Sequence, residues 1–152
     1  MGFDPVMEIT CQDGRLRIRS GATIEQKVEH PGEAIRQILK ENRSPKLEGM
    51  PVFTGGLVGY FAYDYIKYAE PVLKLPDAEE DSFQDVDLML FDKVIAFDNF
   101  RQKMILIVNM KTDALEEEYC KAQLELDRLV QLICFIFPVM ILKLPGHLRR
   151  RW

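Results

Sequence analysis

Residues 53–64 read Phe-Thr-Gly-Gly-Leu-Val-Gly-Tyr-Phe-Ala-Tyr-Asp, so three glycines accompany a run of aromatic residues. Gly55 and Gly56 permit a positive φ or a close approach of backbone. From Leu57 to Tyr63, aliphatic and aromatic side chains occupy both alternating faces, which predicts a central strand that is covered on both sides. We expect Gly59, inside this strand, to make room for a neighbouring backbone or an aromatic ring.

The glycines also invite comparison with loops that bind phosphate. Such loops place their glycines between a strand and a helix, so that the helix N-terminus meets the phosphate. Here the glycines lead into a strand and no Gly-Lys-Ser/Thr follows, so the context argues against a phosphate site. Asp64, directly after the strand, is either a functional carboxylate or, more commonly for Asp, the cap of the following turn. Residues 64–71 predict a short helical turn that a proline ends.

A hairpin is predicted near the start of the chain. Residues 7–11 and 15–20 flank an Asp13-Gly14 pair, which is a strong hairpin signal. In the second arm, apolar residues alternate with arginines, so one face packs and the other is solvated. An anion-binding strip is the alternative interpretation of the arginine row, and a solvated strand at a sheet edge is favoured over it.

A helix is predicted next. Residues 21–30 are polar and leave their structure open, and Pro31 then begins a helical pattern with Ile35, Ile38 and Leu39 at helix spacing. His30 precedes this proline and has no second histidine or cysteine nearby to complete a catalytic pair. We therefore interpret it as a helix-entry residue rather than a general base.

The second half of the sequence predicts another hairpin and a long helix. Apolar residues in 85–98 and 103–109 indicate strands buried on both sides, joined by a turn at 98–101. Asp113 and Glu116 have the spacing of a capping box at the start of an amphipathic helix that covers the sheet. The apolar face of that helix is formed by Leu115, Tyr119, Ala122, Leu126, Leu129 and Ile133. The pattern breaks at about residue 134, so we divide the chain into a domain, 1–133, and an apolar and basic tail, 134–152.

Composition limits the classes of function. The 152 residues are 47% hydrophobic and 29% charged, as expected of one soluble globular domain. A net charge of −4 argues against general attraction to nucleic acid or anionic lipid. The apolar stretch 135–142 of the tail is far shorter than the ~20 residues of a membrane helix, and Pro138 interrupts it. Cys11, Cys120 and Cys134 form no Cys-x-x-Cys pair, which favours reduced thiols in a cytoplasmic protein.

The sequence contains no recognisable pattern of catalytic or metal-binding residues. There is no metal-ligand spacing, no nucleophile elbow and no cysteine-histidine pair, so we assign no catalytic residue and no metal ligand, and no ligand-binding residue can be named. The residues by themselves predict an α+β domain with two hairpins, a central aromatic strand and two covering helices.

Residues 53–64 closely resemble the N-terminal region of the anthranilate synthase component I family, among the chorismate-utilising enzymes. Other segments are similar to the same region in the family's order, namely Asp4-Pro5, 65–71, 85–92 and 95–98. The resemblance covers about residues 2–133. It implies antiparallel sheets packed together with helices outside, of which this chain is an incomplete piece. The residues that carry the family's signature are Gly55, Gly56, Gly59, Tyr60, Phe61, Tyr63 and Asp64, and we expect them to be structural.

In that family, component I converts chorismate to anthranilate in tryptophan biosynthesis, using Mg and ammonia supplied by a glutamine amidotransferase subunit. The resemblance places the chorismate- and Mg-binding motifs in a larger C-terminal part, whose Lys-Glu-x-Ile and Gly-Asp-Ile-Phe-Gln types are absent here. It also places a Leu-Leu-Glu-Ser-like segment, which contributes to feedback binding of tryptophan, before the first residue. We thus expect a chain without its own cofactor, whose partners are the amidotransferase subunit and the catalytic part.

Two classes of function follow. The first is the non-catalytic, regulatory and scaffolding part of anthranilate synthase component I, inactive alone; the second is a stand-alone interaction module of the same fold. The corresponding part of 4-amino-4-deoxychorismate synthase component I, which shares a glycine-aromatic motif, is the close alternative within the first class. Because the tail looks unlike the family, we expect a truncated or frame-disrupted product, with a natural short protein as the runner-up.

Overall fold

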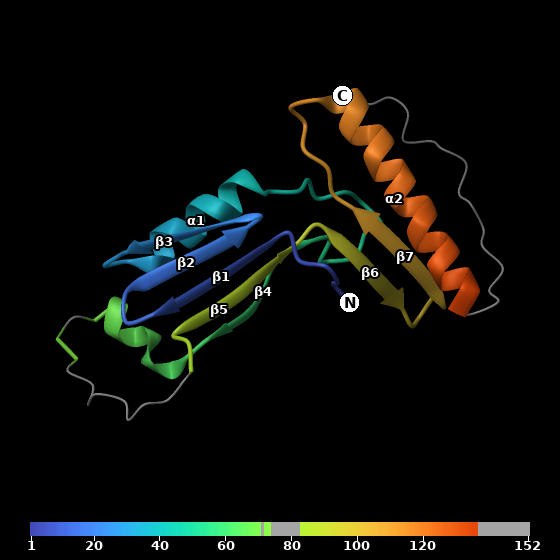
Figure 1. Cartoon of the computed structure of the whole chain (residues 1–152). Helices are drawn as coiled ribbons and strands as arrows, with labels where there is room; N and C mark the ends of the chain where they lie inside the picture. Colours follow the sequence, from blue (N-terminus) through green and yellow to red (C-terminus); the bar gives the residue numbers. More distant parts are fainter. Residues whose placement is uncertain (71, 74–82, 137–152) are drawn as a thin grey trace.

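The computed structural model describes residues 1–70, 72–73 and 83–136. A five-stranded antiparallel sheet has the order β3-β2-β1-β5-β4, and β6 and β7 form a separate two-stranded sheet. Figure 1 shows α1 lying over the larger sheet and α2 beside the smaller one. The strands are β1 (Met7–Gln12), β2 (Arg15–Ser20), β3 (Ala22–Lys27), β4 (Gly56–Phe61), β5 (Val86–Phe91), β6 (Lys93–Asp98) and β7 (Lys103–Val108). The helices are α1 (Pro31–Glu41), the 3-10 helix η1 (Tyr63–Tyr68) and α2 (Leu115–Ile136). The predicted α+β class with antiparallel sheets is confirmed.

The first hairpin forms as predicted, and a third strand extends it. Asp13 and Gly14 both have positive φ, 48° and 74°, as the tight two-residue turn between β1 and β2 requires. The chain reverses again at Gly21 and adds β3, so β2 is an inner strand and β3 is the sheet edge. All six residues of β3 are exposed, so the strand lacks the alternation by which a half-buried strand is recognised.

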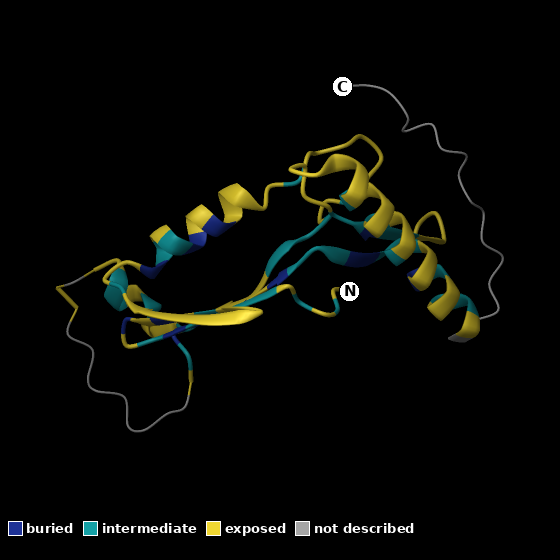
Figure 2. Cartoon of the chain, turned by 45° about the horizontal axis from the view of Figure 1, so that its top comes forward, coloured by how far each residue is buried: buried dark blue, intermediate teal, exposed yellow. Residues whose placement is uncertain are grey.

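The main core lies between α1 and the larger sheet. Ile35 and Ile38 of α1 pack with the inward-facing residues of β1, β2 and β5. Figure 2 shows the buried face of α1 turned toward the sheet and its exposed face turned away. The sheet residues in this cluster are Ile9, Cys11, Leu16, Val86, Leu88 and Leu90. Leu39 was expected on the same helix face, but it remains 46% exposed.

The prediction that residues 57–63 form a central, covered strand is wrong. β4 pairs with β5 on one side and is the edge of the sheet among the described residues. Leu57 is half-buried, whereas Val58, Tyr60 and Phe61 are 48%, 37% and 50% exposed. Apolar residues on both faces of a strand indicate that other elements can pack above and below it. They do not determine whether a neighbouring strand pairs with it on one edge or on both.

The expectation for Gly59 is confirmed by its surroundings. A Cβ built at Gly59 would lie 2.0 Å from the carbonyl oxygen of Asp87 and 2.8 Å from the Cα of Leu88 on β5. Gly55 is similarly close to another segment, because a Cβ there would lie 2.5 Å from Nδ2 of Asn109. The glycines therefore allow close contact between backbones, as proposed for Gly59 from the sequence.

The second hairpin and the long helix are confirmed with smaller corrections. Val94 and Ile95 of β6 are 2% and 7% exposed, so this end of the hairpin is buried on both sides, whereas Phe97 near the turn is 60% exposed. Leu129 of α2 is buried, but Leu115 and Tyr119 at the start of the helix are exposed. α2 begins two residues after Asp113 and continues to Ile136. The division into 1–133 and 134–152 stays a prediction, and most of the tail lies outside the described residues.

Candidate functional site

A cluster of polar side chains connects the first hairpin, η1 and the start of β5. Asp85 is 5% exposed, and its Oδ2 accepts hydrogen bonds from the Tyr68 hydroxyl at 2.6 Å and the Asp13 backbone N–H at 2.9 Å. Its Oδ1 lies 2.9 Å from the Lys67 ammonium, which also donates to Oδ1 of Asp13 at 3.0 Å. The Tyr68 hydroxyl in turn accepts a hydrogen bond from the N–H of Gly14 at 2.8 Å. Every polar group in this cluster is therefore partnered.

The charges in the cluster stabilise one protonation state. Burial would raise the pKa of the Asp85 carboxyl, but the hydrogen bonds from Tyr68 and Lys67 outweigh it and hold that pKa below its ordinary value. Burial would lower the pKa of Lys67, yet its bonds to Asp85 and Asp13 raise it. Burial, and then the bond to Asp85, raises the pKa of the Tyr68 phenol. At neutral pH the cluster is a carboxylate, an ammonium and a neutral phenol, none of which is suited to exchange a proton.

Cys11 lies at the inner side of this cluster. Its Sγ is 3.7 Å from the Tyr68 hydroxyl, and burial raises the pKa of its thiol. Cys11, Cys120 and Cys134 are all free, as the sequence indicated. A buried thiol with a raised pKa is a poor nucleophile, so Cys11 contributes packing rather than reactivity.

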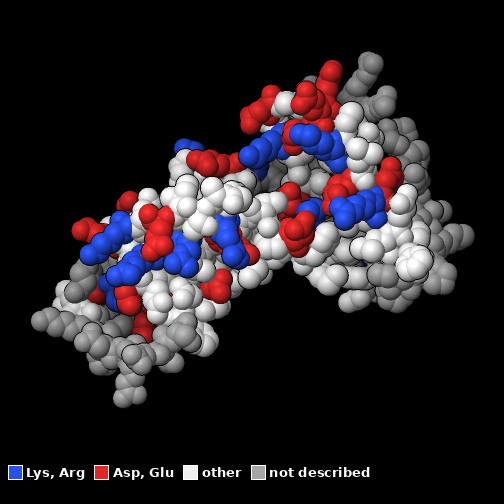
Figure 3. Space-filling view, in the orientation of Figure 1, with Lys and Arg blue, Asp and Glu red and all other residues white. Residues whose placement is uncertain are grey.

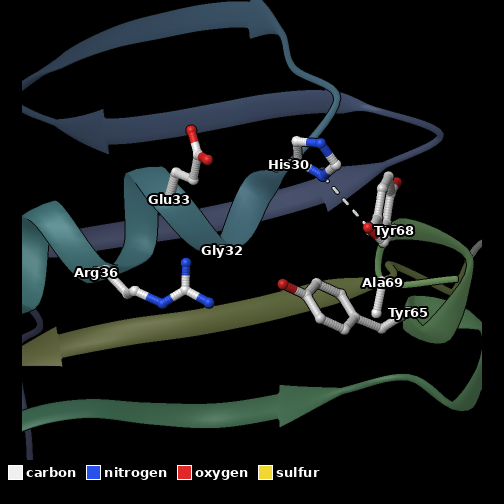
Figure 4. A pocket seen from close by; sticks show the side chains of 7 residues that line it. All are labelled: His30, Gly32, Glu33, Arg36, Tyr65, Tyr68 and Ala69. Carbon is white, nitrogen blue, oxygen red and sulfur yellow. Dashed lines mark hydrogen bonds between the residues drawn. The ribbon is translucent and has the colours of Figure 1, made fainter.

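A hollow of about 330 Å³ opens beside the cluster, between the start of α1 and η1. In Figure 4 the guanidinium of Arg36 and the hydroxyl of Tyr65 point toward each other across it, while Glu33 points away. Nδ1 of His30 lies 3.3 Å from the carbonyl oxygen of Tyr68 and joins the two segments. A Cβ at Gly32 would lie 2.9 Å from the Tyr65 hydroxyl, so glycine is what allows this approach. His30 is thus a helix-entry residue, as predicted, with no side-chain cap bond.

The signature residues border the polar cluster but are not among its hydrogen-bonding groups, which are Asp13, Gly14, Lys67, Tyr68 and Asp85. The ring centroids of Tyr60 and Phe83 are 5.7 Å apart, and Phe61 meets Tyr65 edge-on at 4.9 Å, which ties β4 to η1. Tyr63 is 88% exposed. The capping role predicted for Asp64 is wrong, because Ala62 is the N-cap of η1, no side chain caps it, and Asp64 lies in the first turn. Gly55 and Gly56 have φ of 139° and 134°, which strongly favours glycine.

No pattern in the sequence predicts the polar cluster. Lys67 is 54 residues from Asp13, and Asp85 is 72 residues from it. No motif joins residues at such separations, because the turn, the 3-10 helix and the strand meet only after the sheet has formed. The Asp13-Gly14 turn is recognisable in the sequence, but the role of its backbone as a donor to Asp85 and Tyr68 is not.

A second carboxylate, half-buried but with one buried oxygen, lies where the chain passes from the larger sheet to the smaller one. Asp92 connects β5 to β6, and its backbone carbonyl accepts hydrogen bonds from the N–H and the side-chain amide of Asn109 at 2.8 and 3.0 Å. Its Oδ1 is buried and has no hydrogen-bond partner among the described residues. Burial raises the pKa of Asp92, and the charge of neighbouring Lys93 offsets this only in part.

Metal sites and membrane spans are absent from the described ranges. There, no group of three or more His, Cys, Asp or Glu side chains is placed to hold a metal ion. None of the helices in residues 1–70, 72–73 and 83–136 is long and apolar enough to cross a bilayer. On the face shown in Figure 3, basic and acidic side chains are interspersed over both lobes.

Comparison with known proteins identifies the family. A family model described as chorismate binding enzyme matches residues 1–138. Anthranilate synthase component 1 of Acinetobacter calcoaceticus is 38% identical over 139 residues, which are 88% of this chain and 28% of that protein. The corresponding protein of Acetivibrio thermocellus is 31% identical over 126 residues, which are 80% of this chain and 25% of that protein.

A solved structure shows the same fold. The crystal structure of anthranilate synthase component I from Streptococcus pneumoniae TIGR4 matches with a TM-score of 0.60 at 21% identity, covering 85% of this chain and 28% of that one. The chain thus spans between about a fifth and somewhat more than a quarter of the length of the curated relatives that it matches. It belongs to the chorismate-binding enzyme family and corresponds to a region of anthranilate synthase component I.

Proposed function

We propose that this chain is the N-terminal, non-catalytic scaffolding part of an anthranilate synthase component I and that it does not convert chorismate by itself. The observation that carries the proposal is an apolar area on the sheet face opposite α1 that residues 1–70, 72–73 and 83–136 leave uncovered. This mating face, as we call it, comprises Val58, Tyr60 and Met89, which are 48%, 37% and 38% exposed. In a family whose named relatives are several times longer, such a face is where the rest of the protein would pack.

The register of the sheet shows where this face changes from polar to apolar in one row, next to a row in which Asp87 is paired with Tyr60. One row of directly paired residues crosses all five strands in the order Thr23, Arg19, Glu8, Met89, Val58. Directly paired residues lie on the same face, so the row changes from polar to apolar between β1 and β5. Arg19 and Glu8 form an ion pair. The polar part of the row is therefore stable in water and needs no other protein segment to cover it. The apolar half has no such arrangement, and covering it would remove hydrophobic surface from water.

The chemistry of the described residues is consistent with a scaffold. The Tyr68, Asp85 and Lys67 groups bond to one another, so they offer no free acid or base to a substrate. The same residues do not fit Mg²⁺, which needs carboxylate oxygens that are free to coordinate, whereas both oxygens of Asp85 are engaged. We therefore place the chorismate and Mg²⁺ sites, and the contact with a glutamine amidotransferase subunit, in the longer protein. The free cysteines favour a reducing compartment, and we propose the cytoplasm.

Complementation tests this function. The chain would be assayed with chorismate, ammonia and Mg²⁺, alone and after co-expression with the part of the Acinetobacter calcoaceticus protein that lies outside the matched region. We expect no anthranilate fluorescence from the chain alone and ammonia-dependent anthranilate formation from the pair. Anthranilate made by the pure chain would overturn the proposal.

Two variants in the same cross-strand row make the test specific to the mating face. Met89→Lys places a charge in the apolar half and should weaken complementation at least about tenfold, because burying an unpaired ammonium at an interface is costly. Thr23→Lys is the matched control at the polar end of the row, where the residue is exposed, and should complement normally. Equal complementation by both variants would show that the rest of the enzyme does not pack on this face.

A further inference from the structure

The hollow between α1 and η1 contains two polar groups that the fold does not use. Its volume of about 330 Å³ is at the small end of the range for ligand pockets. Within the part of the chain that the structure describes, no hydrogen bond or ion pair engages the guanidinium of Arg36 or the hydroxyl of Tyr65. The neighbouring Asp85, Lys67 and Tyr68, by contrast, bond to one another. Donors that the fold leaves free at the wall of a cavity are available to a ligand.

These two groups border the same empty space beside Gly32. A Cβ built at Gly32 would lie 2.9 Å from the hydroxyl oxygen of Tyr65 and 3.9 Å from Nη2 of Arg36. Arg36 follows Gly32 by one turn, and long helical side chains point back toward the helix N-terminus, so its guanidinium lies over this turn. Figure 4 shows the two groups directed toward each other from α1 and η1, while Glu33 points away. A ligand oxygen at this place would meet hydrogen-bond donors from both elements.

The walls of the hollow are held in place by contacts within the protein. The hydroxyl of Tyr68 donates to Asp85 at 2.6 Å and accepts from the N–H of Gly14 at 2.8 Å. The carbonyl oxygen of Tyr68 lies 3.3 Å from Nδ1 of His30, which links η1 to the start of α1. The ring of Tyr65 packs against that of Tyr68, with the ring centroids 5.4 Å apart. Binding therefore needs little rearrangement of these walls, which lowers its entropic cost.

We propose that the hollow binds a small monocarboxylate with a flat apolar body. A guanidinium holds a carboxylate through two parallel hydrogen bonds, and the Tyr65 hydroxyl supplies a further donor. Among the described residues that line the hollow, Arg36 is the one Lys or Arg, and Glu33 lies at the rim. A single negative charge thus suits the site better than the nearly two charges of a phosphate group. The rings of Tyr65 and Tyr68 offer an apolar surface against which a flat body packs.

The hollow is separate from the mating face. α1 packs on one side of the larger sheet, whereas Val58, Tyr60 and Met89 are exposed on the other side. Packing of a longer protein on the mating face therefore leaves the hollow beside α1 open. The ligand site goes beyond the proposed function and does not rest on it.

Titration of the isotope-labelled full chain, followed by the NMR shifts of its backbone amides, tests the site. Benzoate should shift the amides at the start of α1 and in η1 and should saturate at millimolar concentrations, as an open site with one charged contact allows. Benzamide has the same ring without the charge and should bind at least about tenfold more weakly. Inorganic phosphate should also bind more weakly than benzoate. Acetate, which represents the carboxylate of an Asp or Glu side chain from another protein segment, should bind more weakly because it lacks the ring.

Three variants locate the binding in the hollow, and the amide spectrum of each shows whether it is folded. Arg36→Gln removes the guanidinium and should weaken benzoate binding at least about tenfold. Lys40→Gln is the matched control, because it removes the same charge from an exposed position of α1 outside the hollow and should bind like the wild type. Gly32→Ala places a methyl group 2.9 Å from the Tyr65 hydroxyl and should abolish the saturable shifts. α1 should remain folded in this variant, since alanine favours a helix more than glycine does.

Several results would overturn the proposal. They are the absence of saturable shifts with benzoate, benzamide binding as tightly as benzoate, and equal benzoate binding by the wild type and either Arg36→Gln or Gly32→Ala. Acetate or phosphate binding as tightly as benzoate would overturn the assigned class of ligand. Because the chain is titrated alone, the result is independent of complementation.

Discussion

Gly59→Ala is the perturbation whose effect the structure determines most directly. The added methyl group would lie 2.0 Å from the carbonyl oxygen of Asp87 and 2.8 Å from the Cα of Leu88. Ordinary contact begins at 3.4 Å, so the oxygen and the methyl group would have to separate by about 1.4 Å. Both neighbours are backbone atoms of β5, which is itself held by β1 on its other side. No flexible side chain can move aside, so the β4 to β5 ladder must open.

The expected loss of stability follows from these contacts. Overpacking of a well-packed region costs about 1–3 kcal/mol, and each backbone hydrogen bond lost from the centre of the ladder adds about 1 kcal/mol. With one or two such bonds lost, the total of about 2–5 kcal/mol is a large part of the roughly 5–15 kcal/mol by which small domains are stable. Gly21→Ala provides the matched control, because Gly21 has a φ of 73° and no atom lies within 4 Å of the place that its Cβ would take. It should lose only the roughly 1–2 kcal/mol that a left-handed conformation costs.

Urea unfolding followed by circular dichroism measures both substitutions. We expect a much lower unfolding midpoint for Gly59→Ala than for Gly21→Ala, with hydrogen exchange of the β4 amides accelerated only in the former. Equal losses of unfolding free energy in the two variants would refute the conclusion that Gly59 is required for close backbone contact.

Two further predictions concern Asp85, which is buried, and Asp92, which is half-buried, because the pKa values of their carboxyl groups shift in opposite directions. Asp85→Asn should cost about 3 kcal/mol at pH 7, because it breaks the ion pair with Lys67. Since its pKa lies below the ordinary 3.8 when folded, the difference from wild type should be constant above about pH 5 and shrink as the pH falls below 3.8, as urea titrations would show. Asp92→Asn should instead stabilise the fold by about 1 kcal/mol at pH 7, because it removes a poorly solvated charge. Burial raises the pKa of Asp92 in the folded state, so this gain in stability should decrease as the pH falls from that raised pKa toward 3.8, where the carboxyl group becomes neutral in both states. A gain that persists below pH 3.8 would contradict the conclusion that the charge of Asp92 destabilises the fold.

Local features of the fold were predictable because neighbouring residues determine them. Asp13-Gly14 predicts a tight turn wherever it occurs between two strands, and both residues have the positive φ that this turn needs. Pro31 fixes the start of α1, and Ile35 and Ile38 are buried as their spacing indicated. The signature residues and the segments similar to the family in the same order also identified the chorismate-utilising enzymes from the sequence, and the family match over residues 1–138 confirms it.

Features that depend on distant residues were not predictable. β3 has no alternation because both of its faces are exposed, so only its pairing with β2 makes it a strand. The polar cluster at Asp85 brings together groups that lie 54 and 72 residues from Asp13. The role of a strand as edge or centre is likewise set by its partners.

Residues 53–64 show most clearly which features the local sequence determines and which depend on the tertiary structure. Its sequence by itself determined a glycine-rich strand with aromatic residues on both faces and a close backbone contact at Gly59, because alternation and the absence of a Cβ are local properties. Tertiary structure decided that β4 has β5 on one side and exposed Val58 and Tyr60 on the opposite face from α1. A side-chain pattern describes which surfaces prefer to be covered, whereas the number and order of neighbouring strands depend on the folding of the whole sheet.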